Sequence, residues 1–492
     1  MSHLLAIDQG TTGTTTLLFD EKLVPVARAY RELTQHYPQP GWVEQDPLEI
    51  RDGVLATIRE CLKDQVPAAI GITNQRETTI LWDRTTGLPL TPAIVWQCRR
   101  TTEICEQVRR FGFENAIRTR TGLVLDPYFS ATKIAWLLDH YELRDAARLG
   151  KVAFGTVDSW LLYCLTGGKV HSTDHANASR TLLYNLYEQQ WDEELLAIFS
   201  VPASILPEIR ENAGLLGETD VDGIPRGIPI CGMAGDQQAA LFGQHCFQPG
   251  MAKNTYGTGC FLLANTGSRV MRPKHGLLST VAWKLKGNIS YALEGSVFVA
   301  GSAVQWLRDG LGIIERASES EELALQVPDT GGVYLVPAFV GLGAPHWDPH
   351  ARGTLVGITR GTNKAHLARA TLEAIAYQSY DLIEQMRQDG ASIAELRVDG
   401  GASNNNLLMQ FQSDILGLPV IRRSMVESTA LGAAMLAGLG AGIWETPEQI
   451  PYEGEETRFS PTLPPEQCQA MLAGWQEAVN RSRGWAKCTT SP

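Results

Sequence analysis

The chain has 492 residues, of which 44% are hydrophobic and 20% charged, and its formal net charge is −12. A chain of this length exceeds one ordinary hydrophobic core, so we expect two large domains of roughly 200 to 250 residues with a ligand cleft between them. The acidic balance argues against nucleic acid or an anionic membrane surface as a partner, because either favours a concentrated basic face.

Three features of the sequence bear on the cellular location of the protein: the first residues, the apolar runs and the cysteines. The first residues lead directly into a strand-like segment and carry no signal-peptide pattern. The small-apolar run from 431 to 444 is interrupted by glycines and is shorter than the ~20 residues that span a bilayer, so it predicts a buried helix end. Nine scattered cysteines without a CxxC pair indicate reduced thiols. We therefore expect a cytoplasmic protein without membrane insertion.

Two strand-turn-strand units organise the chain. Residues 4–8 and 16–20 read as strands around a Gly/Thr tip, which predicts a β-hairpin, and residues 251–263 repeat the pattern around Gly257-Thr258-Gly259. The repeat suggests two related domains, 1–247 and 248–492.

The segments between the hairpins alternate strands with amphipathic helices, which indicates an α/β fold with mixed sheets. The predicted strands are 68–73, 79–82, 332–337 and 395–399, and the predicted helices are 99–110, 130–140, 366–387 and 407–416.

The hairpin tips are candidate phosphate sites. The chain contains no GxxxxGK[ST] loop and no protein-kinase motif set. In Asp8-Gln9-Gly10-Thr11-Thr12, glycine would let backbone N–H groups approach an anion, and Asp8 could hold Mg²⁺ through water. The alternative is an ordinary turn, although Gly257-Thr258-Gly259 offers the same chemistry from the other half.

Asp236 follows Gly235 at a predicted strand-to-helix junction. Such a carboxylate can cap the helix or accept a proton from an attacking hydroxyl, and the spacing does not distinguish the two roles.

Arg76 and Glu77 end an apolar strand. Adjacent charges there most often form a weak surface ion pair. In a cleft they would offer donors and acceptors suited to a small polyol. Trp96 and Phe261 are core aromatics by default, or walls for the polyol carbons.

Taken together, these segments resemble the FGGY family of carbohydrate kinases, in particular its glycerol-phosphorylating members, whose fold is shared with actin and the heat-shock chaperone ATPase domain. The resemblance rests on residues 8–12, 75–79, 96–100, 235–238 and 254–260, and on two family signatures at 128–136 and 353–373. It covers the chain from residue 4 to about residue 475.

The resemblance implies two ribonuclease H-like domains with mixed sheets flanked by helices and an interdomain cleft. It implies transfer of the γ-phosphoryl group of ATP to a terminal hydroxyl of glycerol with Mg²⁺, feeding glycerol catabolism and lipid precursors, in a homo-dimer or homo-tetramer. By matching motif, the general base is Asp236 and the metal residues are Asp8 and Asp236. Glycerol would contact Arg76, Glu77, Trp96, Tyr128, Asp236, Gln237 and Phe261. The nucleotide would contact Thr11, Thr12, Gly13, Thr258, Gly301, Gln305, Gly401 and Asn405.

Two departures from the family pattern carry expectations. The family's first hairpin usually has serines and then an arginine that reaches the nucleotide, whereas this chain has Gly13-Thr14-Thr15. Loss of that charge predicts weaker ATP binding, by roughly ten- to a hundred-fold if nothing replaces it. The loop that binds an inhibitory sugar bisphosphate in some members is here the short stretch 221–227, so we do not expect that regulation.

Two rival functions remain open at this point. A sibling kinase acting on another polyol or a ketose would keep both hairpins and Asp236 but change the polar groups near Arg76. A nucleotide-switch protein would use ATP to change shape, but the candidate polyol cluster argues against it.

Overall fold

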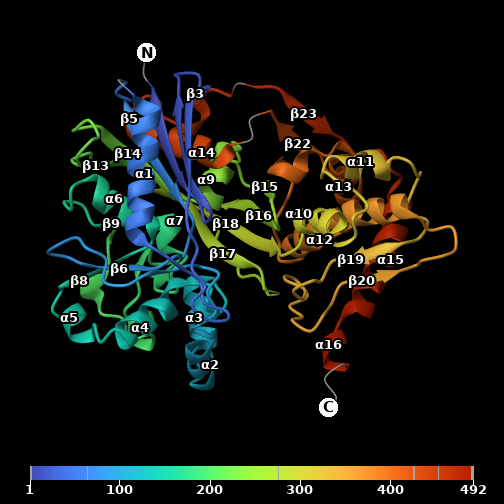
Figure 1. Cartoon of the computed structure of the whole chain (residues 1–492), viewed down its shortest axis with the longest axis horizontal. Helices are drawn as coiled ribbons and strands as arrows, with labels where there is room; N and C mark the ends of the chain where they lie inside the picture. The colour runs from blue at the N-terminus through green and yellow to red at the C-terminus, as the bar shows by residue number, and fades with distance from the viewer. Residues whose placement is uncertain (1–2, 64, 275, 425–426, 453, 489–492) are drawn as a thin grey trace.

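The computed structural model describes residues 3–63, 65–274, 276–424, 427–452 and 454–488, and the side chains of 487 and 488 lie outside the described part (Figure 1). Two mixed β-sheets, each flanked by helices, form the framework. This confirms the predicted α/β fold with mixed sheets.

The first sheet is built around the N-terminal hairpin. β1 runs antiparallel to β2 and β2 antiparallel to β3, while β5 joins β1 in parallel and β14 joins β5 in parallel. Leu4, Leu5, Ala6 and Ile7 are all buried, as expected for a strand covered on both faces. The strands in spatial order are β13 (Ala213–Glu218), β14 (Pro229–Gly235), β5 (Ala69–Asn74), β1 (Leu4–Gln9), β2 (Gly13–Phe19) and β3 (Pro25–Glu32).

The second sheet repeats this arrangement around the second hairpin. β15 pairs antiparallel with β16 and β16 with β18, while β21 adds to β15 in parallel and β22 to β21 in parallel. The strands in spatial order are β17 (Leu278–Leu285), β18 (Asn288–Val297), β16 (Cys260–Gly267), β15 (Met251–Tyr256), β21 (Glu395–Asp399), β22 (Val420–Arg423) and β23 (Glu456–Phe459). The shared strand order supports the inferred relation between the halves, and the division at 247/248 stays a prediction.

One late helix joins the two sheets. α14 (Ser428–Gly440) follows β22 of the second sheet but packs on β1, β5 and β14 of the first. In Figure 1 it lies beside β14 and α9 (Asp236–Gly243), away from the C-terminal α15 (Pro465–Ser482). The approach depends on glycine, since a Cβ on Gly71 would lie 2.0 Å from the Ala433 carbonyl oxygen. The stretch 431–444, predicted to be a buried helix end, therefore forms most of α14, a buried helix of the second half that packs on the sheet of the first.

The remaining elements surround these sheets. Paired short strands are β4 (Glu44–Gln45) with β7 (Ala93–Ile94), β6 (Ile80–Asp83) with β8 (Val152–Gly155), β9 (Ser172–Asp174) with β12 (Glu208–Arg210), β10 (Tyr184–Asn185) with β11 (Gln190–Trp191), and β19 (Tyr334–Val336) with β20 (Thr354–Val356). The first-half helices are α1 (Pro47–Leu62), α2 (Thr102–Arg110), α3 (Glu114–Thr121), α4 (Ser130–His140), α5 (Arg144–Arg148), α6 (Val157–Leu165), α7 (His175–Ala178) and α8 (Glu193–Ile198). Those of the second half, besides α14 and α15, are α10 (Gly301–Gln305), α11 (Glu319–Ala324), α12 (Lys364–Gln388), α13 (Asn406–Leu416) and α16 (Trp485–Cys488).

Most predicted elements lie where the periodicity placed them. The helix predicted at 130–140 and the strand at 395–399 match α4 and β21, whereas α2 begins three residues later than the predicted 99. None of the helices in the described ranges is long and apolar enough to cross a membrane. The eight cysteines with described side chains are free, and seven of them are buried; Cys488 falls outside that set.

Candidate active site

The carboxyl ends of three adjacent parallel strands create the site. Gln9 of β1, Asn74 of β5 and Gly235 of β14 are aligned in register. Residues next to Gln9, Asn74 and Gly235 in sequence therefore lie together at the carboxyl-end edge of the sheet, where open α/β sheets bind ligands. This edge brings together Asp8, Arg76 and Asp236, which the sequence placed in three separate motifs.

A buried amide network fixes the first hairpin tip. The Gln75 side-chain amide donates to Gln45 Oε1 at 2.8 Å and to Gln9 Oε1 at 3.1 Å, and Gln45 Nε2 donates to the Thr11 carbonyl at 2.7 Å. Trp96 Nε1 donates to Thr11 Oγ1 at 2.9 Å. Gln45, Gln75 and Trp96 thus hold the tip by hydrogen bonds, which leaves its backbone little freedom.

Arg76 and Glu77 do not form the surface ion pair that is usual for adjacent charges. Both are buried, and Arg76 Nε lies 3.9 Å from Glu77 Oε1. Arg76 instead makes a bidentate pair with Glu294 of β18, at 2.6 and 3.0 Å. Glu77 accepts from Arg180 Nε at 2.7 Å, and Arg180 Nη2 also donates to Glu294 at 3.0 Å.

The four charges of this cluster shift one another's ionisation. Burial opposes ionisation of Glu294, but Arg180 and Arg76 outweigh it and lower its pKa to about 2. Burial raises the pKa of Glu77, against the attraction of Arg180 and Arg76. Glu294 is consequently a permanent anion beside Arg76.

Asp236 begins α9, and its side chain does not cap that helix. The N-cap of α9 is Gly235, without a side-chain cap bond. Asp236 Oδ1 accepts from the Gln237 N–H at 2.7 Å and lies 3.2 Å from Arg76 Nε. No bond to Oδ2 occurs among the described residues, and the side chain is 30% exposed. Oδ1 is therefore oriented by the protein, whereas Oδ2 has no bonding partner in the described part of the chain.

Asp8 lies within electrostatic reach of Asp236. Burial, then the charges of Asp236 and Glu427, raise the pKa of Asp8 to about 8. Two carboxylates that repel each other across a polar edge suit a divalent cation. No cluster of three or more His, Cys, Asp or Glu side chains able to hold a metal occurs in the described ranges. The donor set fits Mg²⁺, which commonly takes one or two carboxylates and completes its shell with water and substrate phosphates.

Three aromatic residues predicted to contact the substrate are half-buried: Trp96 and Phe261, predicted to pack on its carbons, and Tyr128, predicted to bind its hydroxyls. The Trp96 and Tyr128 rings meet edge to face at 5.5 Å, and the Arg180 guanidinium lies 5.8 Å from the Tyr128 ring. Phe261 stands on β16 opposite Thr255 of β15. Because each of the three keeps part of its side chain exposed, a purely core role does not describe them.

The predicted nucleotide residues of the second half gather near the second hairpin. The Gly301 N–H donates to the Gly257 carbonyl at 2.9 Å, and Ser302 Oγ donates to the Thr258 carbonyl at 2.9 Å. The Gly401 segment adjoins the same strand, since a Cβ on Gly400 would meet the Tyr256 carbonyl at 2.5 Å. Thr258, Gln305 and Gly401 are exposed, as ligand contacts require.

Two residues predicted to contact the nucleotide also stabilise the fold. Asn405 is the N-cap of α13, its side chain accepting from the Leu408 N–H at 2.8 Å. Gly13 packs against β3, where a Cβ would lie 2.5 Å from the Arg31 carbonyl oxygen.

Four residues near the site were missed by sequence reasoning. The available signal for Glu294 in β18 and Lys253 in β15 was a single charged residue within an extended segment, because charged residues are rarely buried there without a partner. Arg180 and Gln45 gave no comparable signal. Their partners Glu77 and Gln75 are remote in sequence.

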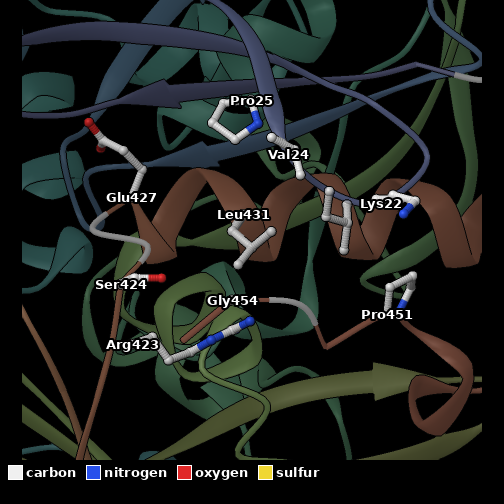
Figure 2. Close-up of a pocket in the computed structure, with 10 residues that line it drawn as sticks. Lys22, Val24, Pro25, Arg423, Ser424, Glu427, Leu431, Pro451 and Gly454 are labelled. Carbon is white, nitrogen blue, oxygen red and sulfur yellow. The ribbon is translucent and has the colours of Figure 1, made fainter. Parts of the chain in front are cut away.

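A separate cavity of about 440 Å³ lies on the flank of α14. Leu431 of this helix points into it, with Val24 and Pro25 on one side and Arg423 on the other (Figure 2). None of the predicted substrate or nucleotide residues lines this cavity.

Known proteins resemble this chain over nearly its whole length. Residues 3–243 match the N-terminal domain, and residues 252–441 the C-terminal domain, of the FGGY family of carbohydrate kinases. Glycerol kinase from Carboxydothermus hydrogenoformans is 56% identical over 98% of both chains, and glycerol kinase 2 from Thermotoga maritima is 54% identical over 99% of this chain and 100% of its own. The crystal structure of Plasmodium falciparum glycerol kinase with ADP superimposes with a TM-score of 0.94 at 38% identity, covering 98% of each chain. The chain therefore belongs to the FGGY family of carbohydrate kinases.

Proposed function

We propose that this protein transfers the γ-phosphoryl group of ATP to a terminal hydroxyl of glycerol, giving glycerol 3-phosphate and ADP. The observation that carries the proposal is Asp236, a partly exposed carboxylate at the sheet edge whose Oδ1 is held by the Gln237 N–H and Arg76. The full-length similarity to glycerol kinases supports glycerol as the acceptor.

Alignment supplies most of the catalysis in this proposal. Phosphoryl transfer needs little covalent help from the protein, so the rate depends on positioning and on neutralising charge. The substrate hydroxyls would bond to Arg76, Glu77 and Gln237, while Trp96 and Phe261 cover the carbon chain. Asp236 Oδ2 would take the hydroxyl proton late, as the new bond to phosphorus forms, so Asp236 need not be a strong base.

The nucleotide would occupy the cleft between the two hairpin tips. Thr11, Thr12, Gly13 and Thr258 would bond to its phosphates, and Gly301, Gln305, Gly401 and Asn405 would approach from the second half. Asp8 and Asp236 would hold Mg²⁺, which neutralises phosphate charge when bound. Closure of the cleft would exclude water, which otherwise competes with glycerol as acceptor.

Two further features belong to the proposal. Homo-dimeric or homo-tetrameric assembly and a cytoplasmic location remain predictions from the sequence. Size-exclusion chromatography with light scattering on the purified protein tests the first.

A coupled ADP-release assay with Mg-ATP tests the function, comparing glycerol, xylulose, ribulose, erythritol and no acceptor. We expect glycerol to give the fastest turnover. Asp236→Asn should lower kcat by about 100- to 10,000-fold, the usual contribution of a general base.

Two other outcomes of this assay would contradict parts of the proposal. Faster turnover with a pentulose would keep the reaction and overturn the acceptor. ATP hydrolysis at one rate with every acceptor would instead support a nucleotide-switch protein.

A further inference from the structure

We propose that Lys253 and Glu294 form a two-point clamp through which the second sheet positions Asp236. Neither residue would touch the substrate, so both are positioning residues. The inference rests on the proposed role of Asp236 as the proton acceptor, and it adds how that carboxylate is held.

The two residues share one face of the second sheet. Lys253 of β15 and Glu294 of β18 both pair with Leu263 of the intervening β16. Cross-strand partners point to the same face, and two strand spacings separate the outer residues by about 10 Å. Lys253 is 0% exposed and Glu294 2% exposed. The sheet thus presents one buried cation and one buried anion side by side toward the first half.

Each charge contacts a residue that orients Asp236. Lys253 Nζ donates to Gln237 Oε1 at 2.5 Å, and Glu294 binds both terminal nitrogens of Arg76. The Gln237 N–H and Arg76 Nε are the two donors directed at Asp236 Oδ1. Both groups that fix this oxygen are therefore held by the opposite sheet.

Stability alone gives a weak reason for this arrangement. Lys253 has no ion-pair partner in the described part of the chain, and its other bond is to Thr255 Oγ1 at 2.9 Å. Burial lowers the pKa of Lys253, while the charges of Asp399 and Asp236 oppose that shift. Arg180 Nη1, in the same charge cluster, is buried without a hydrogen-bond partner among the described residues. Apolar residues in such places are often neutral or stabilising, so the retained charges indicate a geometric task.

The clamp predicts a specific kinetic pattern. Lys253→Met and Glu294→Gln should each lower kcat by about 100-fold, the scale expected when a catalytic group is misplaced by about 1 Å. Because Arg76 and Gln237 are also proposed contacts of the acceptor, its KM should rise as well, and the fall in kcat at saturating acceptor is the diagnostic change. In an Asp236→Asn background neither substitution should lower kcat further, because there is no longer a carboxylate to position.

Asn254→Ala provides the matched control. Asn254 is equally buried on the same strand but on the opposite face, where Nδ2 donates to Ser379 Oγ at 3.1 Å. We expect Asn254→Ala to change the melting temperature, since it removes a buried hydrogen bond, without the loss of kcat seen for Lys253→Met. Equal losses of kcat for Lys253→Met in both the wild-type and Asp236→Asn backgrounds, or no loss in either, would overturn the clamp.

The clamp and the proposed function can fail separately. If glycerol proves not to be the acceptor, the same cycle is measured with the acceptor that is used, or on basal ATP hydrolysis. The thermal unfolding midpoints of Lys253→Met, Gln237→Ala and the double variant give a test without any acceptor. A non-additive midpoint shift supports the contact, and an additive one contradicts it.

Discussion

Thr15 occupies the position at which the family resemblance predicts an arginine. It lies in β2 opposite Asp8 of β1 and opposite Tyr30 of β3, so the three side chains share a face. Arg28 is on the same face, two residues from Tyr30, but its guanidinium is 3.5 Å from Glu427. The nearest cation found on this face is thus already engaged with an acid, and it does not substitute for an arginine at position 15.

Thr15→Arg should therefore improve nucleotide binding. A charge-assisted bond to phosphate contributes about 1.5–3 kcal/mol, so we expect the KM for ATP to fall by roughly ten-fold or more. The added cation would also lie opposite the acidic Asp8. Steady-state kinetics at saturating glycerol measure the change, with Thr15→Met as the uncharged control of similar length. An unchanged KM for ATP would show that the missing charge is already compensated.

At the scale of elements, α12 contains a buried acid that costs stability. Glu373 is 4% exposed, and its Oε1 accepts from Arg369 Nε at 3.0 Å. Burial outweighs that bond and raises the pKa of Glu373 to about 7. The folded state therefore keeps a proton that the unfolded chain releases near pH 4.5. This carboxyl group lowers the free energy of unfolding progressively from about pH 4.5 to 7, and by a constant amount above.

Glu373→Gln should remove this penalty while its amide oxygen still accepts from Arg369. The free energy of unfolding of the variant minus that of the wild type should be larger at pH 8 than at pH 5. We expect this increase to be on the order of 1–3 kcal/mol. Urea denaturation of both proteins at the two pH values gives the difference. The same difference at both pH values would mean that Glu373 titrates as it does in the unfolded chain.

Local patterns were sufficient for the elements and insufficient for their contacts. The apolar strand 4–8, the helix 130–140 and the two Gly/Thr tips follow from periodicity and turn chemistry, which depend on neighbouring residues. The position of α14 on the first sheet depends instead on close backbone approach at Gly71 and Gly432. Motif resemblance placed Arg76 and Asp236, but it could not supply the partners Glu294 and Arg180, which lie more than 100 residues from Arg76.

At the scale of the molecule, α14 couples the two halves through a glycine contact. A Cβ on Gly432 would lie 1.9 Å from the Ala239 carbonyl oxygen of α9. Gly432→Ala should therefore force α14 away from α9 and destabilise the protein by about 1–3 kcal/mol.

Gly53→Ala in α1 is the control of opposite sign. The added Cβ would meet only Thr14 Oγ1 at 3.9 Å, so the usual helix preference for alanine should give about 0.5–1 kcal/mol of stabilisation. Guanidinium denaturation of both variants measures the contrast. Similar stability of the two would mean that α14 can shift without cost.

The sharing of buried charges between the sheets limits how the chain can be divided. A cut in the 244–250 connection would leave Glu294 and Lys253 in one fragment and Arg76 and Gln237 in the other. It would also strip the first sheet of the apolar helix α14, which belongs to the second fragment. Separated fragments would expose the apolar faces of α14 and of the first sheet to water, so neither fragment should persist as an autonomous module. The two fragments should instead reassociate when they are mixed. Recovery of enzymatic activity in the mixture would measure that reassociation.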